Sequence, residues 1–202
     1  MNQIDKLTEI FSHFPGIGPK QSKRFVYYLL TRNGGYLKEI AEAILSLKEE
    51  VTLCESCFRF FPSPKSENLC KICRDKNRSK EQLLLVCRDV DMEPIEKSGI
   101  YDGFYFILGG SVPILEKEPE NRIRLKELTS LLNKRGEIKE IIFAMNMNPE
   151  GEHTQEFVTQ KIKALVADKK IKLSTLGRGL STGTELEYSD SETIKNALKN
   201  RQ

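Results

Sequence analysis

The sequence lacks the long apolar segment that a membrane protein needs. No run of eighteen consecutive apolar residues occurs, so we expect no transmembrane helix and no membrane partner. The first residues, MNQIDKLTEIF, include acids and lack an apolar core, so we expect no secretory signal. With 39% apolar and 30% charged residues, the composition is typical of a soluble folded protein. We therefore expect a cytoplasmic location.

The motifs of several common catalytic sites are also missing. No G-x-x-x-x-G-K-[ST] string is present, so we expect no phosphate-binding loop and no ATPase activity. LEYSD (186–190) resembles the acidic strand of such enzymes, but without the loop we interpret it as structural. The two histidines, His13 and His153, have no serine or cysteine partner at motif spacing. We interpret His13 as a surface or helix-end residue.

The charge is small overall but unevenly distributed. The net charge is +3, and residues 1–80 hold fourteen Lys and Arg against nine Asp and Glu. This half is therefore the better candidate for contact with a polyanion, although solvated surface lysines explain the excess equally well. The same two interpretations apply to a basic run that could touch DNA, formed by Lys71, Arg74, Lys76, Arg78 and Lys80.

Hydrophobic spacing predicts helices first and an α/β region later. In residues 1–50, apolar side chains three and four apart predict helices in IDKLTEIF, SKRFVYYLL and LKEIAEAILSLKEE. Residues 51–80 have no such period. Beyond them, short apolar strands alternate with helices, which implies right-handed crossovers and a mainly parallel sheet covered on both faces. The expected strands are 83–87, 104–108, 140–145 and 171–176, and the expected helices are 92–99, 122–136, 153–169 and 191–200.

Four of the five cysteines form two C-x-x-C pairs, separated by twelve residues: Cys54, Cys57, Cys70 and Cys73. This spacing lets both thiolates of a pair reach one ion, and two pairs complete a tetrahedral shell that suits Zn²⁺. Structural zinc contributes on the order of 10 kcal/mol to folding, which a short polar segment needs. No position remains for a catalytic water, so we predict a structural site; the alternative is four unlinked buried thiols. We expect Phe58, Phe60 and Phe61 to surround it.

The string FPGIGPKQSKRF (14–25) is typical of the hairpin in a helix-hairpin-helix motif. Gly16 and Gly18 can take backbone angles closed to other residues, and their amides would lie beside a helix N-terminus that favours a phosphate oxygen. Lys20, Lys23 and Arg24 follow directly. We predict that these five residues bind the DNA backbone independently of base sequence. The alternatives are a plain turn between helices or a contact between subunits.

In order and length, these motifs resemble the RecR family of recombination mediators. Its markers are FPGIGPKQSKRFVYYLL, CESCFRFF…CKICRD, IEKSGIYDGFYFILGG, NPEGEHT and GRGLSTGTELEYSD. The resemblance implies an α+β multidomain fold. Its parts are a helix-hairpin-helix segment (1–50), a four-cysteine zinc finger (51–80), an α/β Toprim domain with a mainly parallel sheet (81–176) and a helical C-terminal segment that exchanges between subunits (177–202).

The resemblance also implies a function and partners. RecR proteins form dimers or ring-like tetramers that can encircle double- or single-stranded DNA. With RecO and RecF they place the RecA recombinase on single strands coated by single-strand-binding protein. The family's DNA-contacting positions fall on Lys20 and Arg24, and its zinc ligands on the four paired cysteines. A location at the nucleoid follows.

The Toprim region departs from catalytic relatives. Where those enzymes have a magnesium-binding glutamate, Cys87 stands, and a thiol is a poor ligand for a hard cation. Glu150 and Glu152 replace the usual acidic pair, with Asp91 as a neighbour. We predict that the two glutamates bind a partner, RecO by resemblance; favourable placement at a helix N-terminus is the alternative.

The sequence therefore leaves three hypotheses for the function. The first is a non-enzymatic DNA-binding mediator. The second is a magnesium-dependent nuclease or topoisomerase-like enzyme, which Cys87 disfavours. The third is an adaptor that binds proteins and meets DNA only incidentally.

Overall fold

The computed structural model describes residues 2–63, 67–177, 179–180, 183, 186–189 and 191–199. The chain divides into two compact units. One comprises Met1–Thr52 with Pro62–Lys65, and the other comprises Leu53–Phe61 with Ser66–Gln202. The α+β fold class predicted from the sequence is confirmed: helices come first, then a four-cysteine cluster and a parallel sheet, and then a C-terminal segment.

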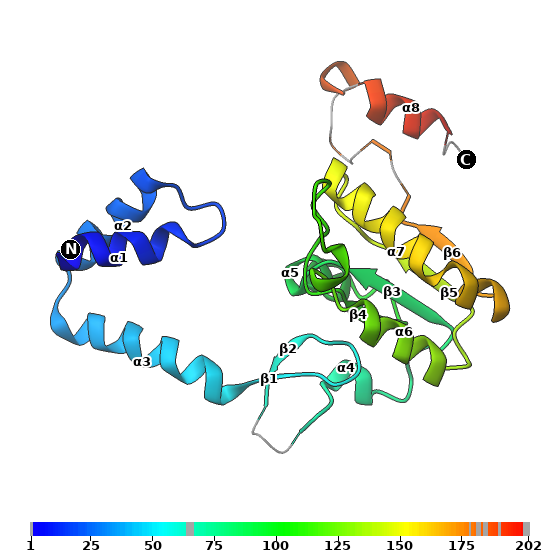
Figure 1. Ribbon diagram of the computed structural model, residues 1–202, viewed down its shortest axis with the longest axis horizontal. Coiled ribbons are helices and arrows are strands. Elements are labelled where there is room, and N and C mark those ends of the chain that lie inside the picture. Colours follow the sequence, from blue (N-terminus) through cyan, green and yellow to red (C-terminus); the bar gives the residue numbers. More distant parts are fainter. Residues whose placement is uncertain are drawn as a thin grey trace. The chain divides into compact units, whose positions relative to one another are not determined.

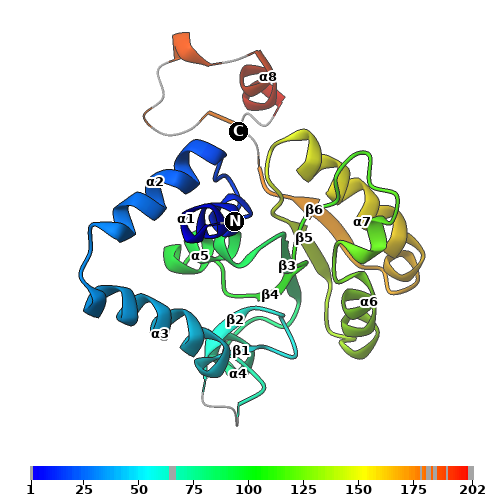
Figure 2. The same ribbon diagram turned by 60° about the vertical axis from the view of Figure 1, so that its left-hand side comes forward.

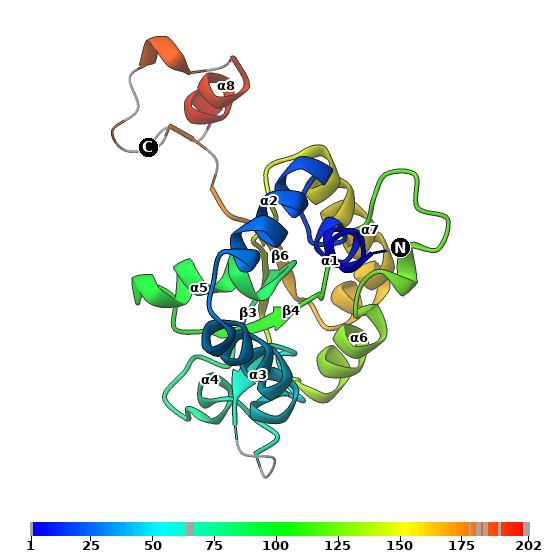
Figure 3. The same ribbon diagram turned by 90° about the vertical axis from the view of Figure 1, so that its left-hand side faces the viewer.

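The first unit consists mainly of the helices α1 (Gln3–Ser12), α2 (Pro19–Leu30) and α3 (Gly34–Glu50). All three were predicted. Helices α1 and α2 lie side by side (Figures 1 and 3) and bury Val26 between them, with the rings of Phe11 and Phe25 5.8 Å apart. Helix α3 is different, because none of its residues is buried.

A four-stranded parallel sheet forms the centre of the second unit. Its strands are β3 (Gln82–Val86), β4 (Phe104–Ile107), β5 (Glu140–Phe143) and β6 (Lys172–Thr175), in the order β4-β3-β5-β6. In register, Leu83 of β3 lies between Phe104 and Ile141 of its neighbours. Strand β3 is a continuous apolar run because both of its faces are buried. The four predicted strands and their parallel arrangement are confirmed.

Helices cover both faces of this sheet (Figure 2). Helices α6 (Leu125–Lys134) and α7 (Pro149–Asp168) pack on one face, where Leu83 and Leu85 point. Helix α5 (Asp89–Ser98) packs on the other through Met92.

The cysteine segment completes the cover of that second face. It contains β1 (Val51–Leu53), β2 (Phe60–Pro62) and the single turn α4 (Lys71–Arg74). Phe61 and Ile72 share one buried cluster with Leu84 and Val86 of β3. In addition, the amide of Ile107 in β4 donates to the carbonyl of Cys57 at 2.9 Å. The segment is too polar to form its own core, and its few apolar side chains instead pack against the sheet.

Some boundaries differ from the prediction for local reasons. Helix α7 begins at Pro149 instead of residue 153, because the Asn148 side chain caps it by accepting from the Gly151 amide. Helix α5 begins at Asp89 instead of residue 92, because Asp91 accepts from the backbone amide of Arg88. Helix α6 begins three residues late, after the 3₁₀ turn η1 (Pro119–Asn121).

The C-terminal segment contains η2 (Leu186–Tyr188) and α8 (Ser191–Lys199). The helix predicted for 191–200 is thus confirmed, and residue 200 lies outside the described part. Within LEYSD, Leu186–Tyr188 form the turn η2 rather than a strand, and Asp190 lies outside the described residues. Among the described helices, none has the length and apolarity to cross a membrane.

Candidate nucleic-acid interface and metal centre

The N-terminus of α2 has no cap of its own. Helices α1, α3 and α7 are each preceded by a cap asparagine whose side chain accepts a hydrogen bond from an amide of the first turn. The cap position before α2 is occupied by Gly18, which has no side chain to do this, and no acid lies in the first turn. Within the described part of the chain, the amides of Lys20 and Gln21 have no backbone or side-chain acceptor. They are free to meet an anion from outside.

The two hairpin glycines differ in backbone conformation. Gly16 has a φ of +76°, which favours glycine. Gly18 has a φ of −85° and a ψ of 172°, which any residue adopts. Of the two glycines, which can both take angles closed to other residues, only Gly16 therefore uses this freedom. A Cβ atom at Gly18 would meet no other atom within 4 Å. A side chain at this cap position would nevertheless lie close to the free amides of the first turn.

Exposed cations lie on the first turns of the same helix. Lys20, Lys23 and Arg24 are all exposed, and no acid occurs between Glu9 and Glu39. The structure thus brings the predicted DNA-binding residues together: Gly16 and Gly18 in the hairpin, and the three cations on the first turns of α2. His13 is exposed at the C-terminal end of α1, as expected.

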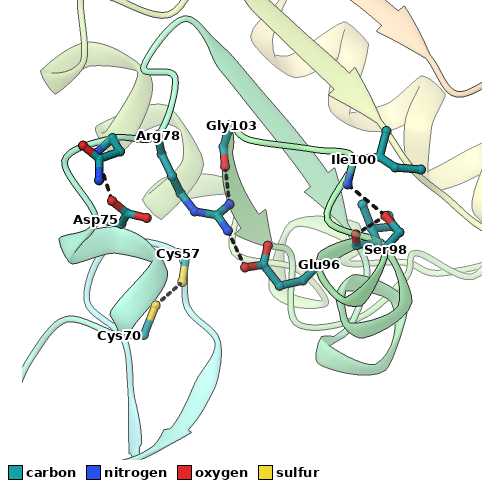
Figure 4. A network of polar contacts seen from close by, with 10 residues as sticks. Cys57, Cys70, Asp75, Arg78, Glu96, Ser98, Ile100 and Gly103 are labelled. Atoms are coloured by element: carbon teal, nitrogen blue, oxygen red, sulfur yellow. Dashed lines mark hydrogen bonds and ion pairs between the residues drawn. The ribbon is translucent and has the colours of Figure 1, made fainter.

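The paired cysteines converge on one point. Their sulfur atoms all lie within 4.8 Å of one another. Those of Cys57 and Cys70 are 3.6 Å apart (Figure 4), close to the ~3.8 Å edge of a tetrahedron with 2.3 Å zinc–sulfur bonds. The Cys70 amide points at the Cys54 sulfur at 3.4 Å, as expected for a donor that stabilises a thiolate. The four sulfurs fit a metal ion.

The four thiols of the cluster influence one another's protonation. Contact with Cys57 lowers the pKa of the Cys54 thiol, whereas contact with Cys54 raises the pKa of Cys57. Four close sulfurs compete for protons, and a divalent ion would hold all of them as thiolates. Three of the four are buried. Of the aromatic residues expected around the site, Phe61 lies in its buried cluster and Phe58 packs on Phe106, but Phe60 is 55% exposed and does not enclose it.

The C-terminal ends of β3 and β5 gather the remaining predicted residues. Burial, together with the charges of Asp91 and Glu150, raises the pKa of the Cys87 thiol to about 11. The Cys87 sulfur lies 3.3 Å from that of Met145. Glu150 accepts a hydrogen bond from Ser111. Among the described residues, the four paired cysteines form the only group of three or more His, Cys, Asp or Glu side chains that could hold one metal ion.

Known proteins match this chain in separate segments and over its whole length. Family models match as follows: RecR helix-hairpin-helix at residues 4–48, Toprim domain at 81–176, and RecR C-terminal at 179–202. The "Recombination protein RecR" of Dehalococcoides mccartyi is 34% identical, covering 98% of this chain and 93% of that protein. The protein of that name from Bdellovibrio bacteriovorus is 32% identical over 100% and 97%.

The chain belongs to the RecR family. A third relative, from Staphylococcus saprophyticus, is 33% identical over 98% of this chain and 96% of its own length. The resemblance drawn from the sequence motifs is confirmed, including the Toprim region and the four-cysteine cluster of the RecR pattern.

In this RecR-family chain the basic run at 71–80 is not one solvated face. Arg78 is largely buried and pairs with Glu96 while donating to the Gly103 carbonyl at 2.8 Å (Figure 4). Arg74 pairs at the surface with Glu67 at 2.7 Å. These two arginines pair with acids of the same unit, whereas Lys71, Lys76 and Lys80 of the run are exposed.

The sequence reasoning missed one exposed cluster in the first unit. The guanidinium of Arg32 lies 4.0 Å from the ring centroid of Tyr28 and 6.0 Å from that of Tyr36. Tyr28 lies on α2, Arg32 in the turn that follows and Tyr36 on α3, so no helical spacing in the sequence joins all three.

Proposed function

We propose that this RecR-family protein is a non-enzymatic DNA-binding mediator of recombination and DNA repair. In this proposal it forms part of a ring or clamp and acts with RecO and RecF to load RecA onto single strands coated by single-strand-binding protein. It works in the cytoplasm at the nucleoid. The observation that carries the proposal is the uncapped N-terminus of α2, where free amides of Lys20 and Gln21 lie beside exposed cations.

Such a site would bind phosphates without contacting the bases. Backbone amides and flexible lysines contact phosphate oxygens, which are the same in every sequence and in both double- and single-stranded DNA. Each subunit offers few contacts, so a ring that holds several hairpins on one DNA molecule would raise affinity through effective concentration. The exposed Ile44, Leu45 and Leu47 of α3 support an assembly of subunits as dimer or tetramer.

The cysteine cluster is proposed to hold Zn²⁺ through Cys54, Cys57, Cys70 and Cys73. Four sulfur donors without an oxygen donor favour zinc over magnesium or calcium. When bound, the ion would fix the two cysteine pairs against the sheet and supply no catalytic chemistry. The division into domains at 1–50, 51–80, 81–176 and 177–202, with exchange of the last between subunits, likewise remains a proposal.

We assign partner binding to Glu150 and Glu152. Glu152 lines a hollow of about 150 Å³ together with Met145 and Met147, and Met147 is 64% exposed. Acids beside exposed apolar side chains suit a basic and apolar protein surface such as RecO would have to present. The thiol of Cys87 and its raised pKa make the same end of the sheet a poor magnesium site.

The hairpin is tested by Lys20→Ala combined with Arg24→Ala. We expect weaker binding to every DNA sequence, and the slope of log affinity against log salt to fall by about 2. Fluorescence anisotropy at several salt concentrations measures both. Lys126→Ala with Lys134→Ala on α6 removes the same charge elsewhere and should change little. Unchanged affinity in the hairpin variant contradicts the assignment.

The enzymatic alternative has its own test. Pure protein is incubated with supercoiled DNA and Mg²⁺, and the products are compared with those of Glu150→Gln. A non-enzymatic mediator leaves the DNA unchanged in both cases. A product that disappears in the variant would revive the nuclease or topoisomerase-like activity.

A further inference from the structure

Cations and aromatic rings share one ridge along α2. Lys20, Arg24 and Tyr28 follow one another at intervals of four residues on α2, so consecutive members are neighbours on the helix, and Arg32 follows in the turn beyond its C-terminal end. A turn connects the end of α2 to Arg32, whose amide donates to the Leu29 carbonyl at 3.0 Å. All four side chains are exposed. We call them the α2 ridge.

The C-terminal end of the ridge is a stacked cluster. The Arg32 guanidinium lies 4.0 Å from the Tyr28 ring centroid, and the ring of Tyr36 stands at 78° to that of Tyr28 with the centroids 6.5 Å apart. Tyr28 is 45% exposed and Tyr36 37% exposed. Planar groups held in this way leave preorganised flat surface open to solvent.

The two ends of the ridge suit different parts of a nucleotide. The N-terminus of α2 carries partial positive charge, free amides and two ridge cations, which fits phosphate. The C-terminal end carries partial negative charge, which repels phosphate, but it offers rings and a planar cation that fit the face of a base. Lys20 and Tyr28 are about 12 Å apart along the axis, a length that about three stacked nucleotides span.

The charge of the surrounding chain agrees with this occupant. Residues 10–38 contain five Lys and Arg and no Asp or Glu. Within residues 10–38 a peptide partner would find no acid to pair with its own cations, whereas the five cations attract a polyanion.

We propose that Tyr28, Arg32 and Tyr36 form a stacking platform for an unpaired nucleobase of a strand whose phosphates lie at the hairpin. This rests on the proposed DNA binding and extends it. A base inside a duplex has both faces covered by its neighbours, so the platform adds affinity for single-stranded DNA only. The protein then distinguishes exposed strands from duplex without reading sequence.

The test compares three DNAs of equal length: a thymine homopolymer, the same backbone with abasic residues, and a duplex. With the full chain, Tyr28→Ala should weaken binding of the homopolymer by about tenfold, near the lower end of what one stacked base contributes. Binding of the abasic strand and of the duplex should not change. Two further variants separate stacking from charge. Tyr28→Phe keeps the ring and should retain affinity for the homopolymer. Arg32→Lys keeps the charge without the planar group and should lose affinity.

Tyr27→Ala is the matched control, because Tyr27 is 51% exposed on the same helix and is not stacked on Arg32. Equal weakening on abasic and normal strands overturns the platform. So does a change of oligomeric mass in Tyr28→Ala, which would make the cluster a contact between copies. The two proposals can also fail separately. If Tyr28→Ala loses its preference for the homopolymer while the Lys20→Ala/Arg24→Ala variant binds DNA normally, the phosphate site at the hairpin is refuted and the stacking platform is retained.

Discussion

At the scale of single residues, Arg78 connects the cysteine segment to the rest of the second unit. It pairs with Glu96 of α5, and the two side chains are only 14% and 25% exposed. It also donates to the Gly103 carbonyl just before β4. From the sequence it was one member of a basic run, because nothing in the spacing of charges shows which of them becomes buried.

We predict that Arg78→Ala lowers the free energy of unfolding by about 3 kcal/mol, since Glu96 keeps a poorly solvated charge without its partner. Thermal unfolding followed by circular dichroism measures the change. Arg74→Ala is the matched control: its pair with Glu67 is 49% and 37% exposed and should be worth less than about 1 kcal/mol. Equal losses in the two variants would contradict the structural role of Arg78.

At the scale of elements, the cysteine segment shows how far a sequence pattern reaches. The spacing of the four cysteines predicted their convergence, because two residues between ligands set the geometry of each pair locally. The same pattern contains no information on what the segment packs against. Its place on the sheet depends on Phe61 and Ile72 meeting Leu84 and Val86, a match between surfaces far apart in the chain.

The helices and strands repeat this contrast. Strand β3 was predicted within one residue of each end, because an apolar run bounded by polar residues is a strong local signal. The start of α7 was missed by four residues: its first turn is polar, and only the Asn148 cap marks it. Likewise, the stacking of Arg32 on Tyr28 depends on the turn that continues past α2.

The metal centre gives a prediction at this scale. Purified protein should contain about one zinc ion per chain by plasma mass spectrometry, and Cys70→Ala should lose both the ion and thermal stability. Cys87→Ala removes an equally buried thiol and should keep the ion. Protein without metal, or retention of zinc in Cys70→Ala, would contradict the proposed centre.

Thiol titration extends this test, because burial raises the pKa of Cys87 from 9.0 to about 11. At pH 8 about one Cys87 thiol in a thousand is ionised, so a thiol reagent should react with it only after unfolding. A chelator should first release the four paired cysteines. The native state holds the Cys87 proton more tightly than the unfolded state does, so this contribution to stability is complete below pH 9 and is lost as the pH rises towards 11.

At the scale of the whole molecule, assembly decides whether weak contacts suffice. Helix α3 has seventeen residues and buries none of them within the described chain. Ile44, Leu45 and Leu47 are between 59% and 73% exposed. Exposure of several apolar side chains on one long helix is unfavourable in water, so we infer that another subunit packs against them.

We predict that Leu45→Glu reduces the oligomeric mass measured by light scattering without unfolding the protein, because a charge placed in an apolar contact must be desolvated when subunits meet. DNA affinity should fall with the mass, although every hairpin residue is intact, since fewer hairpins then act on one DNA molecule. Leu115→Glu is the control, as Leu115 is 93% exposed in the second unit. An unchanged mass in Leu45→Glu would remove α3 from the assembly. A reduced mass with unchanged DNA affinity would show that a single hairpin is enough, and the clamp would then not be needed to explain binding.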